Sequence, residues 1–180
     1  MKLSGSDTKN NIFFAVIFAL GFLLSAAFMP YVQGIGFGAN SMVKADLLFA
    51  LSIVCGIIYE NRKAVSIMAL VAGVVSDIFL TPPMHLSPVL FLLGAYFASE
   101  TVSVFPRVNA LTAAVSSVPF FLARAVTGCV FLMSANSETK FGDILKLSIL
   151  PEFVCNILCV FIVYVILAFL YKRFKRKFYI

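Results

Sequence analysis

No charged residue occurs between Lys9 and Lys44, and this stretch contains 22 mostly apolar residues at positions 11–32. A helix of about 20 apolar residues is long enough to cross the hydrocarbon core of a bilayer, which is about 30 Å thick. The rest of the 180-residue chain is similar, with 62% hydrophobic and 12% charged residues. Soluble domains have about 45–50% and about 25%, respectively. The sequence therefore excludes a soluble globular protein and predicts a polytopic helical membrane protein.

Polar, glycine-rich or proline-containing segments interrupt the apolar runs. Thr81-Pro82-Pro83-Met84, for example, ends one run, because consecutive prolines remove backbone donors and restrict the preceding residue. The first run could also be read as a cleaved signal peptide, but its length favours a retained helix. We expect a single all-α integral membrane domain over residues 1–180, with six transmembrane helices at 11–32, 43–59, 64–80, 87–104, 108–133 and 147–171.

Basic residues are distributed unevenly over the expected loops and ends. With both ends in the cytoplasm, ten lie inside and three lie outside, which satisfies the positive-inside rule. The inner group is Lys2, Lys9, Arg62, Lys63, Arg107, Lys172, Arg173, Lys175, Arg176 and Lys177, and the outer group is Lys44, Lys140 and Lys146. This pattern predicts N-in, C-in topology, with both chain ends in the cytoplasm.

The chain has a net charge of +6, which in a soluble protein would suggest a nucleic-acid partner. The chain lacks the dense basic and aromatic patch of a nucleic-acid-binding surface, so membrane topology explains its basic residues better. The basic tail, positions 172–177, is either a topology anchor or a contact for anionic lipids.

The four cysteines lie inside apolar runs and predict neither disulfides nor a zinc site. They are Cys55, Cys129, Cys155 and Cys159.

Four ionisable residues fall in the outer half of the expected membrane region, each on a different helix. They are Asp46, Asp77, Arg124 and Glu152. Residues of this kind usually face the interior of a helix bundle and pair with one another. We expect Arg124 to pair with one of the three carboxylates, either as a structural ion pair, as part of an outward-open ligand pocket, or in a network on which a partner depends. His85 lies in the adjacent outer loop, where it could contact a ligand or partner.

The chain offers no constellation for catalysis. It has one histidine, no Ser-His-Asp or Cys-His arrangement and no HExxH motif, so neither a nucleophile nor a metal site is indicated. We therefore expect a protein that is not an enzyme and that uses no metal or cofactor.

Small residues share one face of the third expected helix. Ala69, Gly73 and Asp77 follow one another at intervals of four, with Ala72 and Ser76 beside them. Such spacing allows two membrane helices to approach closely. It places Asp77 on the packed side of its helix, away from lipid.

The segment from Val71 to Pro83, followed by Leu92-Leu93-Gly94-Ala95-Tyr96, resembles the core of the rod shape-determining MreD family. Gly73, Asp77, Pro83 and Tyr96 match the family motif in order and spacing. Ala45-Asp46-Leu47-Leu48 is similar to the start of the family's second helix. His85 stands where the family usually has a glycine, so the resemblance covers about residues 45–100 with this one departure.

The resemblance implies a non-enzymatic inner-membrane scaffold of the bacterial elongation machinery. Its partners would be a membrane-anchored MreC-like protein, the RodA and penicillin-binding synthases that build the lateral wall and, indirectly, MreB. The family is similar in fold to the six-helix substrate-binding subunits of energy-coupling-factor vitamin transporters. A vitamin-binding transport subunit is therefore the alternative function, since likeness of fold does not determine function.

Overall fold

A computed structural model of the chain describes residues 5–34, 46–59, 61–79, 86–105, 108–135, 142 and 150–178. In this part of the chain the secondary structure is entirely helical and contains no strand, which confirms the all-α class. The helices are α1 (Gly5–Gly34), α2 (Leu47–Ile58), α3 (Arg62–Phe79), α4 (Ser87–Val104), α5 (Ala110–Ala135) and α7 (Leu150–Phe178).

Three of these helices are long and apolar enough to cross a membrane, which indicates a membrane protein. The candidate membrane-spanning segments are Thr8–Ala27 in α1, Ala110–Thr127 in α5 and Glu152–Phe174 in α7. By contrast, α2 has only 12 residues, and at 1.5 Å per residue its length of about 18 Å is shorter than a hydrocarbon core of about 30 Å.

The ends of the helices differ from the predicted ends for local reasons. The helix expected at 43–59 begins at Leu47, because the Asp46 side chain caps its first turn. The helix expected to end at 171 continues to Phe178, so the basic tail extends α7 instead of following it. α4 spans 87–104 as predicted, with a proline in its first turn, where a missing N–H is tolerated. Pro83, His85 and the side chains of Lys175, Arg176 and Lys177 lie outside the described residues.

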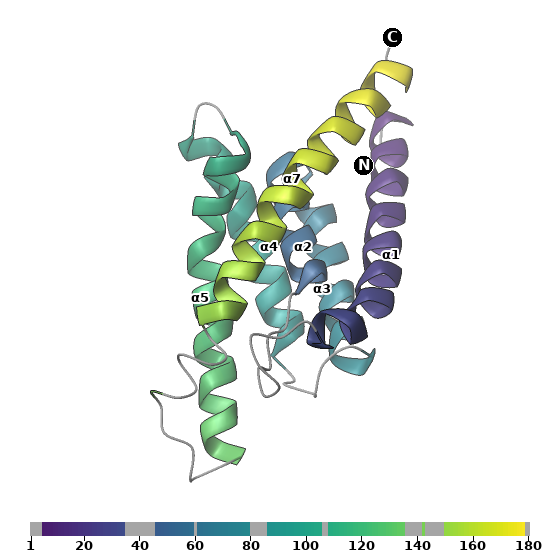
Figure 1. Ribbon diagram of the computed structural model, residues 1–180. Coiled ribbons are helices and arrows are strands. Elements are labelled where there is room, and N and C mark those ends of the chain that lie inside the picture. The colour runs from purple at the N-terminus through teal and green to yellow at the C-terminus, as the bar shows by residue number, and fades with distance from the viewer. Residues whose placement is uncertain are drawn as a thin grey trace.

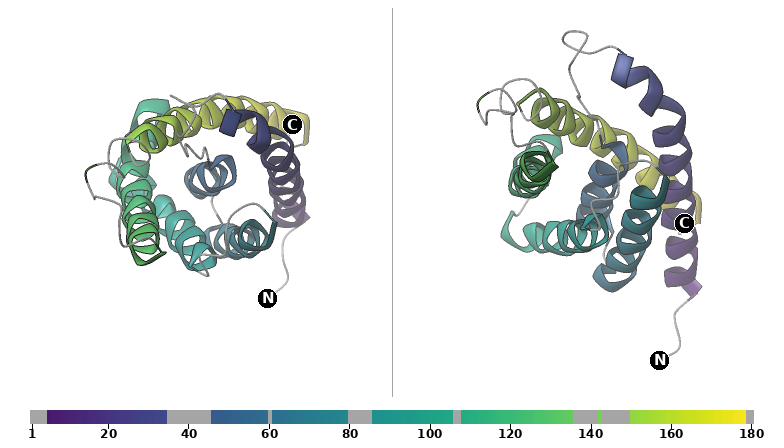
Figure 2. Two further views of the ribbon diagram at one scale, coloured as in Figure 1. Left: turned by 60° about the horizontal axis from the view of Figure 1, so that its bottom comes forward. Right: turned by 90° about the horizontal axis from the view of Figure 1, so that it is seen from below.

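The short helix α2 forms the centre of the bundle. Seen from below, it is surrounded by α1, α3, α4, α5 and α7 (Figure 2), and it contacts all five of them. Every residue from Leu48 to Ile57 is buried. A helix that is apolar on all sides is stable only when other elements cover it, so the surrounding helices are what keep α2 in place.

Aromatic side chains join the first helix to the last at the end of the bundle where both chain ends lie (Figure 1). The rings of Phe13 and Phe174 stack with centroids 4.5 Å apart, and those of Phe14 and Tyr59 stack at 4.3 Å. The Tyr59 hydroxyl also donates a hydrogen bond to Asn11 of α1. α1, α2 and α7 are thereby fixed to one another at this end.

Candidate functional site

Asp46 is the N-cap residue of α2 and takes part in two buried hydrogen bonds. Its carboxylate accepts a hydrogen bond from the Phe49 amide, 2.9 Å from Oδ1, which caps the helix in the manner typical of aspartate. Its own backbone N–H donates to Oδ1 of Asn156 on α7, at 2.7 Å. One residue therefore starts the central helix and connects it to the last one.

Arg124 of α5 reaches the same carboxylate and forms an ion pair with Oδ2 of Asp46. Both side chains are buried, with exposed fractions of 9% for Arg124 and 7% for Asp46. The Arg124 Cζ atom lies 5.2 Å from the centroid of the Phe49 ring and 5.7 Å from that of Phe91 on α4. At these distances the electron-rich ring faces attract the cation.

We call these five residues the Asp46 clasp: Asp46, Phe49, Phe91, Arg124 and Asn156. They come from α2, α4, α5 and α7, and every one of them is buried. A buried cation and anion that neutralise each other hold helices in one arrangement, because separating them would leave an uncompensated charge. The Arg124 Nη1 atom is buried and has no hydrogen-bond partner among the described residues.

Of the three carboxylates considered for Arg124, the structure selects Asp46. Glu152 is half-buried in the first turn of α7, one turn before Asn156 on the same face. Asp77 is half-buried on α3, and its Oδ1 atom is buried without a hydrogen-bond partner among the described residues. Glu100 of α4 pairs with Arg62 at the exposed start of α3.

The small-residue face of α3 packs against α4. A Cβ atom on Gly73 would lie only 2.6 Å from the Cα of Pro88, a separation that side chains essentially never show. Ala69, Ala72 and Ser76 on this side of α3 are buried as well. Tyr96, the motif residue on α4, is instead 44% exposed.

Sequence reasoning missed three members of the clasp. Asn156 is a single amide in the apolar run of α7, and polar residues inside membrane helices usually have a partner, so this signal was present. Phe49 and Phe91 carry no such signal, because they are two of 20 phenylalanines. Their role depends on packing that only the structure shows.

The side chains of the clasp are suited to holding helices together. In the part of the chain that the structure describes, no group of three or more His, Cys, Asp or Glu side chains could hold a metal ion. The clasp presents one neutralised ion pair enclosed by aromatic rings, an arrangement suited to fixing helices. Comparisons of the chain with protein-family models, with curated proteins and with solved structures found no match.

Proposed function

We propose that this chain is an MreD-like scaffold: a non-enzymatic inner-membrane component of the bacterial complex that builds the lateral cell wall. The observation that carries the proposal is the motif segment containing Gly73, Asp77 and Tyr96. In the fold this segment forms the neighbouring helices α3 and α4, which approach closely at Gly73. A closely packed pair of helices of this kind is a suitable platform for a partner's membrane helix.

Asp77 is the residue of the motif best placed to affect a partner. Its half-buried carboxylate lies near the end of α3, and its buried Oδ1 atom makes no hydrogen bond to the described residues. The side chain as a whole is only half-buried, so a hydrogen-bond donor from an MreC-like protein could reach the exposed part of the carboxylate. This exposure supports Asp77 as an assembly residue.

Capture of the MreC-like protein by a tagged form of this chain tests the assignment. We expect Asp77→Asn to lower capture at least tenfold with little change in thermal stability. The matched control is Glu100→Gln, which makes the same carboxylate-to-amide change on α4 in an exposed pair and should capture normally. Wild-type capture by Asp77→Asn would contradict the proposed role of the motif.

The proposal includes six membrane crossings with both ends in the cytoplasm, in which the short α2 counts as a crossing because the other helices enclose it at the centre of the bundle. Single cysteines at Asn40, Asn61 and Asn136 in a cysteine-free background test it in intact cells. Asn40→Cys and Asn136→Cys should react with a membrane-impermeant thiol reagent, and Asn61→Cys should not. Reaction of Asn61→Cys would overturn the topology.

Depletion of the protein from the rod-shaped cell that encodes it tests the function itself. We expect rounding and widening of the cells, because lateral wall synthesis would lose its membrane scaffold. Normal shape combined with a vitamin requirement would instead support a transport subunit.

A further inference from the structure

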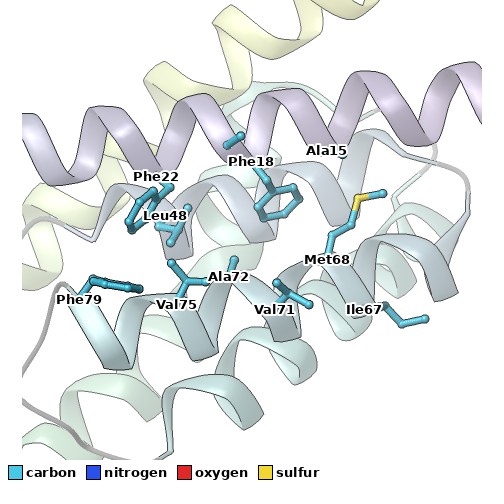
Figure 3. Close-up of a pocket in the computed structure, with 11 residues that line it drawn as sticks. Ala15, Phe18, Phe22, Leu48, Ile67, Met68, Val71, Ala72, Val75 and Phe79 are labelled. Carbon is cyan, nitrogen blue, oxygen red and sulfur yellow. The ribbon is translucent and has the colours of Figure 1, made fainter.

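An apolar groove of about 750 Å³ runs between α1 and α3, and we call it the α1–α3 groove. All of its lining side chains are hydrophobic. In Figure 3 Phe18 and Phe22 of α1 face Met68, Val71 and Phe79 of α3 across it. Leu48 of the central helix also lines it, so the groove reaches inward as far as the core of the bundle.

The two ends of the groove differ. At one end the rings of Phe22 and Phe79 meet edge to face, with centroids 6.0 Å apart. At the other end stands Ile67, and Lys63 lies one helical turn before it, exposed and on the same face of α3. The neighbouring Arg62 is paired with Glu100, whereas Lys63 forms no ion pair with any residue that the structure describes, so it supplies a positive charge there. The groove thus has an aromatic end and a cationic end.

The dimensions of the groove fit a lipid tail better than a protein helix. From Ile67 to Phe79 it follows α3 over 12 residue-to-residue steps, or about 18 Å at 1.5 Å per step, close to the roughly 15 Å depth of one leaflet. A helix about 10–12 Å across would occupy roughly 1,400–2,000 Å³ over that length. That is about twice the volume of the groove or more.

We propose that the α1–α3 groove binds one acyl chain of an anionic phospholipid, whose headgroup lies against Lys63. The tail replaces water or loosely packed lipid along the apolar walls and ends at the Phe22–Phe79 pair. The Lys63 ammonium attracts the headgroup phosphate, while its methylene stem lies along the apolar surface. The proposal is independent of the elongation function, because it rests only on this groove.

The chain has no tryptophan, so one introduced indole can report on the groove. Val71→Trp places it on the groove wall, where the native side chain is 56% exposed, and Ile67→Trp provides a second reporter should the first variant fold poorly. The matched control is Val165→Trp on α7, where the native side chain is 51% exposed. Each variant is reconstituted in phosphatidylcholine vesicles containing increasing fractions of brominated phosphatidylglycerol or brominated phosphatidylcholine, and quenching of the indole is measured.

We expect the groove reporter to reach half-maximal quenching at an about fivefold lower fraction of the anionic lipid, the preference that one surface lysine provides. Lys63→Gln should abolish this preference, and Lys172→Gln on α7 should preserve it. The control reporter should respond equally to both lipids. Equal quenching by both lipids at the groove, or a preference that survives Lys63→Gln, would overturn the proposal. So would a groove reporter that both lipids quench less than the control, because a protein helix or a second copy would then cover the site.

Discussion

Asp46→Asn removes the charge from the clasp while keeping the helix cap. Asparagine caps helices about as well as aspartate, so an oxygen still accepts the hydrogen bond from the Phe49 amide. Arg124 is then left as a buried cation without its counter-ion. Removing one member of a buried ion pair costs about 3–5 kcal/mol, so we expect a loss of stability in this range.

Two further substitutions separate the contributions of the cap and the ion pair. Asp46→Ala should cost about 1 kcal/mol more than Asp46→Asn, because it also removes the cap. Arg124→Met leaves Asp46 unpaired and should be as damaging as Asp46→Asn. The double variant, Asp46→Asn with Arg124→Met, leaves no unpaired charge. The loss of stability in the double variant should be smaller than the sum of the losses in the two single variants by about 3 kcal/mol or more.

Cys55 provides the assay. It is fully buried on α2, so a thiol-reactive fluorophore labels it only when the centre of the bundle opens on heating. The background carries serine at Cys129, Cys155 and Cys159. Each kcal/mol shifts the midpoint of a chain of this size by about 2–4 °C, so a loss of 3–5 kcal/mol lowers it by about 6–20 °C.

An exposed ion pair serves as the control. The side chains of Arg62 and Glu100 are 45% and 39% exposed, and such pairs contribute about 0–1 kcal/mol, so Arg62→Met should lower the midpoint by at most about 4 °C. Strictly additive losses for Asp46→Asn and Arg124→Met would refute the reasoning, as would a midpoint for Asp46→Asn no lower than that of the control.

Two other substitutions test helix packing by the same assay. Gly73→Ala should cost about 1–3 kcal/mol, because the new methyl group meets the backbone of Pro88 and α3 must move away from α4. Gly142→Ala, where an added Cβ meets no atom within 4 Å, should cost nothing, and equal midpoints for the two variants would contradict the close approach. Tyr59→Phe keeps the ring stacked on its neighbour but loses the hydrogen bond to α1. It should cost about 1–2 kcal/mol, and an unchanged midpoint would mean that the hydrogen bond contributes no stability.

The positions of the helices could be predicted from the sequence because apolar runs and their interruptions are local features. The range 87–104 matches α4 because a serine and a proline start the run and another proline follows it. The later start of α2 was also foreseeable, since Asp46 is a favoured N-cap residue. The extension of α7 through the basic tail was not, because a run of lysine and arginine is compatible with either a helix or a coil.

The partner of Arg124 could not be predicted, for a geometric reason. Counting residues along a helix gives the depth of a side chain in the membrane, and by depth Asp46, Asp77 and Glu152 were equivalent. Choosing among them requires the direction in which each helix faces and which helices are neighbours. Both depend on α2 occupying the centre of the bundle, an arrangement that long-range packing determines.

The residues of the clasp leave the ribosome at different times, so the clasp cannot form until most of the chain has been synthesised. Arg124 follows Asp46 by 78 residues (124 − 46), and Asn156 follows it by 110. At about 5–20 residues per second, the ribosome adds Arg124 about 4–16 s after Asp46. Throughout that interval the carboxylate lacks Arg124, its partner in the folded protein, and burying it unpaired would cost several kcal/mol. It therefore stays hydrated near the membrane surface, so α2 settles into its central position only after α5 has emerged.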